Sequence, residues 1–450
     1  MKLTVLGAAS PRFPLLLNTI LRRNLPIDEL ALYDLDVQRL KLFRATILEE
    51  VLQYHGRALR LEVYADFQRA VEGADFVFSS IRVGGQEARL NDETVPLELG
   101  LLGQETVGGG GFSLALRTIP VAVRQAEQIH AVSPEAWIVN FTNPAGIITQ
   151  AVKTLSPHDR IVGICDAPEV ITRIVCELYR VPFEEVKILY FGLNHLGWVY
   201  SIKVKGREIL GELIDKNLEA FFQGEPFYAG MREEILKTGL LPNEYFFYYL
   251  HPEQVAANQQ GSSLRRAAGI LRLDGELSKA LELRDGKAVS HFNLYIDRRN
   301  GSYMTNETGY ERPEQHFSLL EQEQDWGYDA VALSVLDSLM GSGSRRTIIN
   351  VENRGFCPYL EAGDIIETSS VRRGEKWEPA GLCPDLPEEY RTLLVSMKDY
   401  ERTLIRAAGT GDFALAVEAL KKNPIIPSDR AEALARAVRK AQGNFLKYLI

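Results

Sequence analysis

Short apolar runs rich in β-branched residues alternate with longer stretches of helical periodicity over the first 200 residues. Five runs have the continuous hydrophobicity of strands buried on both faces: 3–7 (LTVLG), 30–34 (LALYD), 75–81 (DFVFSSI), 137–142 (WIVNFT) and 160–165 (RIVGIC). Between them, residues 14–23 and 37–56 carry apolar side chains at helical spacing. This strand–helix alternation predicts an α/β fold with a doubly wound, parallel sheet.

A different pattern follows the fifth predicted strand. Three stretches combine short apolar runs with polar turns and predict antiparallel strands and helices of a second, mixed α+β domain: residues 188–206, 330–353 and 365–374. From Leu386 onward, apolar positions recur at helical spacing, with breaks near 409–411 and 424–427. We therefore expect the chain to finish in a group of helices.

A polar, turn-rich segment runs from about 284 to 328, and its composition predicts a long loop or lid. With 450 residues, the chain is long enough for two or three domains. The change of pattern after the fifth strand indicates where the first domain ends. We expect one domain at residues 1–165 and a second, which includes the C-terminal helices, at residues 166–450.

The composition is that of an ordinary globular protein, with 46% hydrophobic and 25% charged residues, which excludes disordered, collagen-like and coiled-coil chains. The formal net charge is −9 and there is no strong basic run, so we expect neither a nucleic-acid partner nor a membrane partner. No apolar run approaches 18 residues, and no secretory signal is evident. The four cysteines show no C-x-x-C pairing, which favours a reducing compartment and predicts a cytoplasmic protein.

The first predicted strand opens into a turn of small residues, from Gly7 to Ser10, ahead of the first helix. In such a unit the backbone N–H groups and the helix dipole point at a pyrophosphate. The second strand ends at Asp34, where a carboxylate can accept hydrogen bonds from an adenosine ribose. Gly7, Ser10 and Asp34 therefore predict an NAD-binding, Rossmann-type domain. Only the first glycine of G-x-G-x-x-G is present, so an ordinary strand-to-helix turn capped by Asp34 or Asp36 stays open.

Four later motifs occur in an order and spacing that carry a resemblance to a known family. They are RVGGQEARLNDE from Arg82, GQETVGGGGFS from Gly103, NFTNPAG from Asn140, and the pair GICDAP (163–168) and GLNHLGW (192–198). Together they resemble glycoside hydrolase family 4, the NAD-dependent glycosidases, which do not use the usual pair of carboxylates. The resemblance extends from the first strand to at least Arg265.

The resemblance implies a redox-assisted elimination. NAD⁺ takes hydride from C3 of the sugar, a divalent metal polarises the resulting ketone, and a side-chain base removes the acidified C2 proton. The leaving group then departs from C1, water adds, and the hydride returns to C3. This chemistry needs no nucleophilic carboxylate.

Cys165 and His195 match the family's two metal ligands, and the resemblance implies Mn²⁺ as the ion. A single thiolate and a single imidazole do not complete a structural zinc site, which usually takes four protein ligands. An open site completed by substrate oxygens and water suits Lewis-acid chemistry. A thiolate ligand alone would instead suggest zinc, iron or cobalt, and a buried core thiol with a core histidine is the alternative without a metal.

Tyr245 matches the family's catalytic tyrosine, which acts as the base at C2; Tyr248 and Tyr249 are rivals in the same aromatic cluster. A phenol with a pKa of about 10 must be perturbed to act near neutrality, and a metal-bound substrate can do so. Glu105 matches a family carboxylate that supports the basicity of the tyrosine. Asp166 matches the proton donor to the leaving group in the α-glucosidase branch.

Arg89, Asn143 and Arg265 fall on the substrate-contacting positions of the family. The planar fork of an arginine suits a phosphate group, and the branch for unphosphorylated glycosides has a histidine directly after the metal cysteine, which this chain lacks. We therefore expect a phosphorylated sugar glycoside as substrate. We also expect a homo-oligomeric enzyme, a dimer or tetramer. Residues 110–121 resemble the 6-phospho-β-glucosidase branch, whereas Asp166 matches the α branch.

Two other classes of function stay open at this point. The front half also resembles, more distantly, the malate and lactate dehydrogenases, which oxidise hydroxy acids with NAD and need no metal cysteine. A non-enzymatic, NAD-sensing binding module is the second alternative. Both predict no cleavage of glycosides with any added metal.

Overall fold

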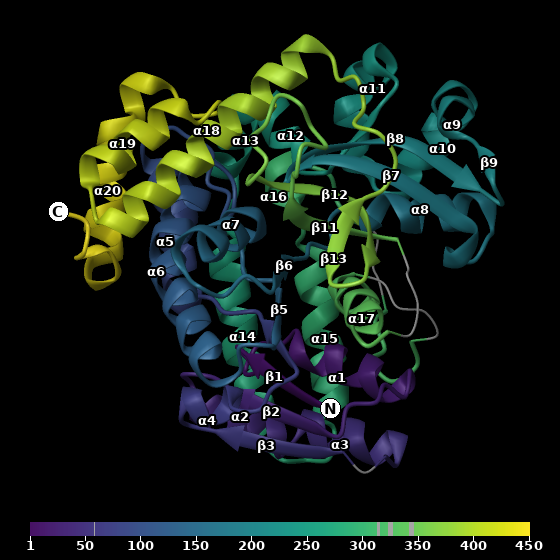
Figure 1. Cartoon of the computed structure of the whole chain (residues 1–450), viewed down its shortest axis with the longest axis vertical. Coiled ribbons are helices and arrows are strands. Elements are labelled where there is room, and N and C mark those ends of the chain that lie inside the picture. Colours follow the sequence, from purple (N-terminus) through teal and green to yellow (C-terminus); the bar gives the residue numbers. More distant parts are fainter. Residues whose placement is uncertain (58, 313–315, 323–326, 342–345) are drawn as a thin grey trace.

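The computed structural model describes residues 1–450 except 58, 313–315, 323–326 and 342–345. Its described strands form one sheet in the order β10-β8-β7-β12-β11-β6-β5-β4-β1-β2-β3, with β13 beside β12 and β9 beside β8 (Figure 1). The parallel half consists of β1 (Lys2–Leu6), β2 (Glu29–Tyr33), β3 (Arg60–Tyr64), β4 (Phe76–Ser79), β5 (Trp137–Asn140) and β6 (Ile161–Gly163). The order 3-2-1-4-5-6 is that of a Rossmann-type sheet, and it confirms the predicted fold class.

The other half of the sheet is antiparallel. Its strands are β7 (Val186–Leu193), β8 (Leu196–Val204), β9 (Arg207–Glu208), β10 (Leu241–Pro242), β11 (Thr347–Glu352), β12 (Ile365–Arg373) and β13 (Lys376–Pro379). The two halves meet where β11 runs antiparallel to β6, with Asn350 opposite Gly163. The antiparallel strands predicted within residues 188–206, 330–353 and 365–374 are therefore confirmed.

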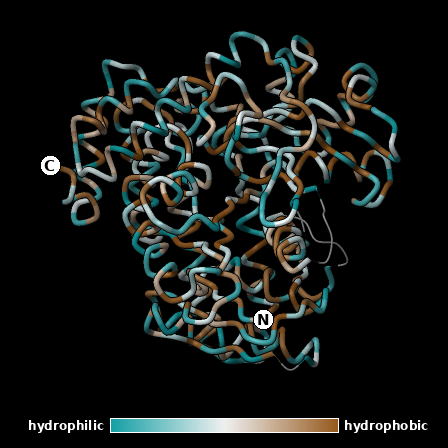
Figure 2. The backbone as a smooth tube through the Cα atoms, in the orientation of Figure 1, coloured by the Kyte–Doolittle hydropathy of each residue, from teal (hydrophilic) through white to brown (hydrophobic). Residues whose placement is uncertain are grey.

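Neighbouring residues of the parallel strands are buried in different cores, one on each face of the sheet. Ile138 and Ile161 belong to one core, and Val139 and Val162, the next residues along, belong to the other. Burial on both faces is the reason for the continuous apolar runs in the sequence. In Figure 2 the hydrophobic stretches lie mainly in the interior and the hydrophilic stretches mainly in the outer loops.

Helices surround the sheet. The first are α1 (Phe13–Arg22), α2 (Val37–Arg44), α3 (Ile47–His55), α4 (Phe67–Val71), α5 (Gly85–Glu98), α6 (Gly108–Val132), α7 (Ala145–Leu155), α8 (Glu169–Tyr179) and η1 (Phe183–Glu185). The next are α9 (Leu210–Lys216), α10 (Leu218–Gly224), η2 (Pro226–Met231), α11 (Arg232–Thr238), α12 (Phe246–Leu250), α13 (Pro252–Gly261), α14 (Arg266–Glu282), α15 (Ala288–Gly301), α16 (Thr305–Thr308) and α17 (Tyr328–Leu339). None of the helices that the structure describes combines the length and apolar character needed to cross a bilayer.

The prediction of a long loop or lid over 284–328 is wrong for residues 288–301 and 305–308, because α15 and α16 occupy them. Val289, Phe292 and Ile296 of α15 are buried, and this helix packs against α3 near the start of the chain. The carboxylate of Glu50 accepts the N–H groups of Ala288 and Val289, both at 2.9 Å. The helix is thus begun and covered by residues far away in sequence; 313–315 and 323–326 lie outside the described residues.

Two smaller differences concern the N-terminal half. The helical pattern over 37–56 forms two helices, α2 and α3, because the chain breaks at Ala45 and Thr46. The edge strand β3 was not among the predicted strands, since all its residues are at least partly exposed and Arg60 and Glu62 interrupt its apolar positions. Edge strands have one unpaired side and need less continuous hydrophobicity than central ones.

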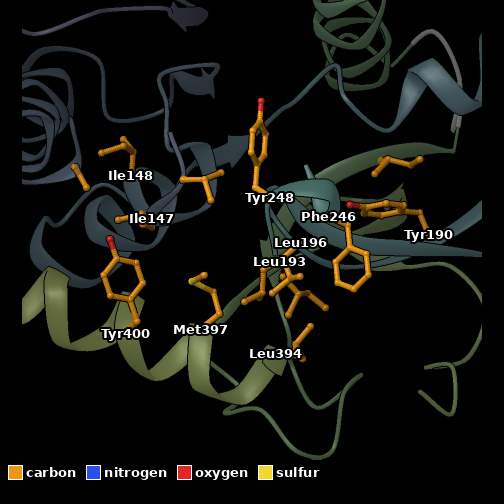
Figure 3. Close-up of a cluster of buried hydrophobic side chains, with 14 of the residues drawn as sticks. Ile147, Ile148, Tyr190, Leu193, Leu196, Phe246, Tyr248, Leu394, Met397 and Tyr400 are labelled. Carbon is orange, nitrogen blue, oxygen red and sulfur yellow. The ribbon is translucent and has the colours of Figure 1, made fainter. Parts of the chain in front are cut away.

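The C-terminal helices follow the predicted pattern. They are α18 (Glu388–Thr410), α19 (Phe413–Lys422), η3 (Ser428–Arg430), α20 (Ala431–Gln442) and η4 (Gly443–Leu446). Met397 and Tyr400 of α18 lie on the side of Ile147 of α7, and Leu394 lies toward Leu193 and Leu196 of the β7–β8 hairpin (Figure 3). The C-terminal helices therefore share a core with the N-terminal half.

Candidate active site

A cavity of about 1050 Å³ opens beside the carboxyl ends of the parallel strands. It is lined by residues that directly follow β1, β2 and β4, among them Gly7, Asp34 and Ser80. Ligands of doubly wound folds bind at this edge of the sheet, where the strand order reverses. The cavity also reaches Arg89 and Asn143, so two of the predicted substrate-contacting residues lie along the same space as the predicted NAD-binding residues.

The turn after β1 is shaped by close backbone contacts. Gly7 has φ +83°, and a Cβ at this position would lie 2.4 Å from the carbonyl oxygen of Ser80. The N–H groups of Gly7 and Ala8 both donate to the carbonyl of Tyr33, at 3.0 and 3.2 Å. Only glycine fits such an approach, and the resulting turn brings backbone against the cavity, as a dinucleotide pyrophosphate requires.

Asp34 fastens this turn to the end of β2. One of its carboxylate oxygens accepts the N–H of Ala9 at 2.9 Å, and the other accepts the N–H of Asp36 at 3.0 Å. Burial raises the pKa of Asp34, while these two hydrogen bonds partly oppose the shift. Gly7, Ser10 and Asp34 all line the cavity. The structure therefore places the three predicted cofactor residues on one wall.

Cys165 and His195 come together from different halves of the sheet. Cys165 lies just beyond β6, and His195 occupies the turn of the β7–β8 hairpin with φ +65°. Cys165 Sγ lies 3.6 Å from His195 Nε2, and both side chains are buried. Within the described residues no cluster of three or more His, Cys, Asp or Glu side chains forms a metal site. The pair is thus an open site that offers two protein ligands.

The electrostatic setting of this pair suits a cation. Burial raises the pKa of Cys165 well above its usual value, and the charge of Glu367 adds to the shift. Burial lowers the pKa of His195 to about 3, so the imidazole is neutral. A divalent cation between the two would replace the thiol proton and take the free lone pair of the imidazole. The donor set therefore fits a divalent metal.

Glu367, on β12, positions the hairpin turn and was missed by the sequence analysis. Its fully buried carboxylate accepts hydrogen bonds from Asn194 Nδ2 at 3.1 Å, Asn350 Nδ2 at 2.9 Å and Tyr190 Oη at 3.1 Å. Burial raises its pKa to about 7. Asn194 precedes His195, so this carboxylate fixes the turn that presents the imidazole. The single glutamate within the predicted strand segment 365–374 was the available signal.

Tyr245 packs directly against the Cys165–His195 pair. Its ring lies parallel to the imidazole of His195, with centroids 3.7 Å apart and planes within 6°. The N–H of Tyr245 donates to Asn243 Oδ1 at 2.9 Å, which fixes the start of α12. Burial raises the pKa of Tyr245 well above its usual value, and the charge of Glu244 raises it further. The ring of Tyr248 lies 5.9 Å from that of Tyr245.

Glu105 is held among arginines. Its Oε2 lies 2.9 Å from Arg82 Nη1 and 2.8 Å from Arg89 Nε. Burial alone would raise the pKa of Glu105, but the charges of Arg82 and Arg89 outweigh it and lower the pKa to about 2. No hydrogen bond among the described residues joins Glu105 to Tyr245. The geometry thus assigns this carboxylate first to the arginines.

The predicted substrate-contacting residues occupy different positions. Arg89 is buried on α5 and lines the cavity, as does Asn143, which precedes the cis peptide bond to Pro144. Arg265 Nη1 donates to Thr94 Oγ1 at 2.7 Å, and Arg265 is not among the residues that line this cavity. Arg89 and Asn143 are therefore brought to one cavity, and Arg265 lies beside α5 instead.

Arg12 is a cavity residue that the sequence analysis did not single out. Its guanidinium stacks over the rings of Phe141 and Tyr328, 4.5 and 5.2 Å from the centroids. Among the described residues no carboxylate pairs with it. It lines the cavity at the start of α1 together with Ser10. A cation held by two aromatic rings at this end of the turn is well placed for an anionic ligand.

Asp166 directly follows Cys165 and is half-buried. Its negative charge contributes to the raised pKa values of Cys165, Tyr245 and Glu367. These effects require that Asp166 lies within electrostatic range of the ligand pair and of the tyrosine. The residues predicted for metal binding and proton transfer thus form one cluster around Cys165 and His195.

Comparisons with known proteins agree on one family. The family model described as "Family 4 glycosyl hydrolase" matches residues 2–181, and the model of its C-terminal domain matches residues 190–426. The chain is 27% identical to the 6-phospho-beta-glucosidase of Escherichia coli, over 99% of this chain and 96% of that protein. It is 31% identical to a 6-phospho-alpha-glucosidase of Leptotrichia buccalis, over 77% of this chain and 82% of that protein.

A solved structure of the same kind covers the whole fold. The Thermotoga maritima 6-phospho-beta glucosidase, determined with manganese, NAD⁺ and glucose-6-phosphate, superposes with a TM-score of 0.80 and 25% sequence identity. The superposition covers 99% of each chain. The similarity therefore includes both the parallel and the antiparallel half of the sheet.

Proposed function

Because the chain belongs to family 4 of the glycosyl hydrolases, we propose that it hydrolyses 6-phospho-glucosides, with the β anomer as the preferred substrate. The stacking of Tyr245 on His195, which lies 3.6 Å from Cys165, carries this proposal. A base, two metal ligands and an arginine-lined cavity form the set of groups that an oxidation–elimination route needs.

The cofactors are NAD and a divalent metal. Solved relatives contain NAD and Mn²⁺, and two features of this chain fit those groups. Gly7 brings the turn within van der Waals range of Ser80, where no side chain fits. Cys165 and His195 are buried and offer a thiol and a neutral imidazole, so that a metal held there would have only two protein ligands. When bound, NAD⁺ supplies a hydride acceptor for C3 and the metal supplies Lewis acidity at the adjacent oxygens.

In this proposal Tyr245 removes the C2 proton. The parallel stacking against His195 fixes the phenol beside the metal ligands, so its oxygen acts on a carbon adjacent to the polarised group. Asp166, next to Cys165, donates a proton to the leaving oxygen. Glu105 holds Arg82 and Arg89 in place through its ion pairs, and thereby orients the cavity wall rather than touching the tyrosine.

Arginines supply the recognition of phosphate groups. Arg89 and Asn143 would contact the sugar phosphate, with Arg265 positioned beside α5 through Thr94. Arg12, at the start of α1, would contact the pyrophosphate of NAD, since it lines the cavity together with Ser10. Two dianionic groups then share a cavity wall rich in guanidinium groups, which suits an acidic protein that needs a local anion site.

The preference for β-glucosides rests on the resemblance of residues 110–121 to that branch, and Asp166 makes the α-glucosidase the second candidate. The division at residue 165, the homo-oligomeric state and the cytoplasmic location stay predictions. A dehydrogenase for hydroxy acids needs no metal, so the Cys165–His195 pair would have no role in its reaction.

The test is to incubate the protein with NAD⁺, Mn²⁺ and a reductant, and to follow the release of aglycone from aryl 6-phospho-β- and 6-phospho-α-glucosides. We expect release from the β substrate that requires both cofactors, and little release from the unphosphorylated glucosides. Faster cleavage of the α substrate would assign the other branch. Reduction of NAD⁺ by a hydroxy acid, with no cleavage of any glycoside, would overturn the proposal in favour of a dehydrogenase.

A further inference from the structure

A second, much smaller cavity lies beside His195. Its volume is about 20 Å³, which is enough for one water molecule. Among the described residues, it shares no lining residue with the cavity of about 1050 Å³. His195 lines the small cavity together with Tyr249 of α12, Tyr400 and Glu401 of α18, and Asn423, which directly follows α19. Polar side chains from four separate segments therefore meet around a space of the size of one water.

The side-chain amide of Asn423 has a donor that no protein group uses. Asn423 is only 2% exposed, and its Oδ1 accepts the N–H of Ile425 at 3.2 Å. Its Nδ2 has no hydrogen-bond partner among the residues that the structure describes. A buried donor without a partner is destabilising, and such groups in native proteins commonly bond to an ordered water. The amide is therefore a suitable partner for a water in the small cavity.

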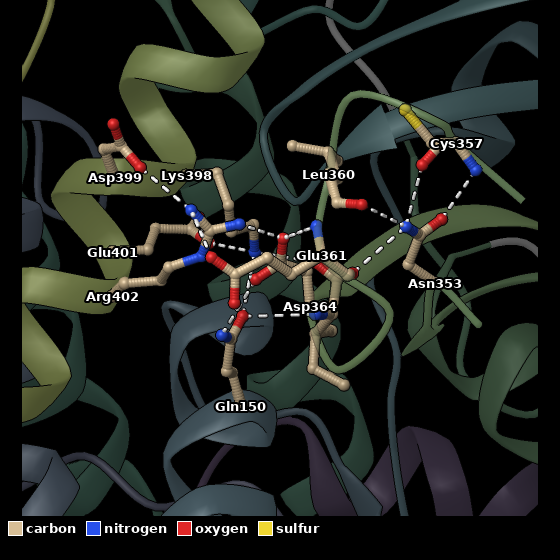
Figure 4. A network of polar contacts seen from close by, with 11 residues as sticks. Gln150, Asn353, Cys357, Leu360, Glu361, Asp364, Lys398, Asp399, Glu401 and Arg402 are labelled. Carbon is tan, nitrogen blue, oxygen red and sulfur yellow. Dashed lines mark hydrogen bonds and ion pairs between the residues drawn. The ribbon is translucent and has the colours of Figure 1, made fainter. Parts of the chain in front are cut away.

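The carboxylate of Glu401 has one oxygen in use and one available. Glu401 is only 4% exposed, and its Oε2 pairs with Lys398 Nζ on the same helix (Figure 4). Lys398 Nζ also donates to Gln150 Oε1 at 2.9 Å and to the carbonyl of Ile365 at 2.7 Å. Among the described residues, Glu401 Oε1 accepts no hydrogen bond. The carboxylate is thus held in place through α7 and β12, and it keeps one acceptor oxygen for the cavity.

His195 has one ring nitrogen that the proposed metal site does not use. Its Nε2 faces Cys165 Sγ at 3.6 Å, and one face of its ring stacks on Tyr245. Its Nδ1 forms no hydrogen bond within the described part of the chain. A histidine that ligates a metal through Nε2 carries its proton on Nδ1, and this N–H is almost always bonded to a carboxylate, a carbonyl or a water. The small cavity has room for such an acceptor.

We propose that one water molecule in the small cavity accepts the Nδ1–H of His195 and donates to Glu401 Oε1, while Asn423 Nδ2 donates to the same water. Tyr400 can accept the remaining O–H, since its hydroxyl end lies toward Ile147, another residue that lines the cavity (Figure 3). Glu401 and Asn423 are then positioning residues. Through the water they fix the plane of the imidazole and make Nε2 a stronger ligand.

The inference rests on the metal ligation proposed above, and its first test measures metal binding instead of turnover. Mn²⁺ is titrated into the full-length protein with NAD⁺ bound, and free Mn²⁺ is followed by electron paramagnetic resonance. In Glu401→Gln and in Asn423→Leu the Kd for Mn²⁺ should rise by about 10- to 100-fold, while the Kd for NAD⁺ should stay within about twofold of wild type. Thr403→Val is the matched control, because Thr403 is equally buried on α18 and does not line the cavity.

Two further readouts would not respond to a merely structural role of these residues. A crystal structure of the Mn²⁺-loaded wild type should show a water within hydrogen-bonding distance of His195 Nδ1 and Glu401 Oε1, and Asn423→Leu should lack it. The d–d bands of the Co²⁺-loaded protein should shift in Glu401→Gln and remain unchanged in Thr403→Val. Melting curves verify that the variants are folded.

The outcomes separate this inference from the proposed function. Wild-type Mn²⁺ affinity in the folded Glu401→Gln and Asn423→Leu variants, or a dry cavity in crystals of the loaded wild type, would overturn the inference alone. Failure of the wild type to bind Mn²⁺ would overturn it together with the proposed metal site.

Discussion

The turn after β1 and the hairpin between β7 and β8 both belong to the proposed active site but are built by different means. The turn is built from backbone contacts. The N–H groups of Gly7 and Ala8 donate to the carbonyl of Tyr33, and Gly7 packs closely against the backbone of Ser80. The hairpin is instead positioned by side-chain contacts, since His195 stacks on Tyr245 and is oriented through neighbouring polar groups. A site made of backbone tolerates new side chains as long as the turn survives, which is why Ala8 and Ala9 can stand in it.

A site made of side chains has no such tolerance, and Cys165→Ser is the most severe way to show it. A hydroxyl is a far poorer anionic ligand than a thiolate, so metal affinity should fall by at least about 10²-fold and glycoside hydrolysis by about 10³-fold. NAD⁺ affinity should stay within about twofold of wild type, because the turn is untouched. Metal content by atomic absorption and NAD⁺ binding by calorimetry give the two readouts. Cys176→Ser serves as the control. A fully active Cys165→Ser enzyme would show that Cys165 is only a buried core thiol and not a metal ligand.

Tyr245→Phe removes one oxygen from the side-chain site and leaves its packing. The ring should still stack on His195, so metal and NAD⁺ binding should persist, whereas kcat should fall by about 10²–10³-fold for lack of a base. Exchange of the C2 hydrogen with solvent deuterium should be slow, and bound NAD⁺ should still be reduced. Tyr248→Phe is the matched control and should behave as wild type. Normal C2 exchange in Tyr245→Phe, together with loss of exchange in Tyr248→Phe, would assign the role of the base to Tyr248 instead of Tyr245.

Arg89→Ala tests the wall of the cavity that Gly7 and Asp34 also line. Loss of a guanidinium that binds phosphate should raise KM for a 6-phospho-glucoside by about 30- to 100-fold, or roughly 2–3 kcal/mol. The KM for an unphosphorylated glucoside should change much less. Because Arg89 also pairs with Glu105, Arg89→Lys should recover part of the loss. An unchanged preference for phosphorylated over plain glucosides would remove Arg89 from phosphate recognition.

Gly7→Ala has the opposite expected effect to Cys165→Ser, because it changes the turn after β1 and leaves the Cys165–His195 pair intact. The added methyl would meet the Ser80 carbonyl in a backbone conformation with positive φ, at a cost of about 2 kcal/mol. We expect the Kd for NAD⁺ to rise by about tenfold or more, with Mn²⁺ content unchanged. Ala9→Gly is the companion variant and should bind NAD⁺ as wild type does. Equal loss of NAD⁺ and metal in Gly7→Ala would mean that the two sites are not built independently.

Asp329→Asn has the smallest expected effect and concerns the stability of the contact between α17 and α1, where the buried Asp329 carboxylate accepts a hydrogen bond from Thr19 Oγ1 at 2.8 Å. Burial raises the pKa of Asp329 to about 6, above its value in the unfolded chain, so the folded state keeps this proton longer. Between pH 4 and pH 6 the unfolded chain therefore binds fewer protons, and the wild type loses stability as the pH rises. The asparagine variant lacks this loss, and its Tm relative to wild type should rise by about 2–4 °C from pH 4.5 to pH 7. A constant Tm difference across this range would contradict the assignment.

The same contrast explains what the sequence could predict. Continuous apolar runs identified the central strands, because burial on both faces leaves a local trace, and the small residues from Gly7 to Ser10 marked the turn. Cys165, His195 and Tyr245 were found through motifs that resemble a family, since no local pattern relates a thiol to an imidazole 30 residues away. Their contact depends on the alignment of separate strands.

Other parts of the structure could not be predicted from any local sequence pattern. Glu367 acts on the site through Asn194, from a strand far away in sequence, and Arg12 gains its role from the rings of Phe141 and Tyr328. The helix α15 is capped by Glu50 and covered by α3, so its sequence appears as a polar loop when considered alone. In each case the deciding partner lies more than 100 residues away.

The seam between the two halves of the sheet, at Asn350 and Gly163, has a consequence for mechanical coupling. Cys165 lies two residues beyond Gly163, on the parallel side, whereas His195 belongs to the antiparallel side. A cation held by both residues would cross-link the seam, and by thermodynamic linkage it would stabilise only the arrangement in which the two halves are aligned. Ion affinity and local opening of the seam are then reciprocal quantities. Slow amide exchange around β6 and β11 would be the signature of a loaded enzyme.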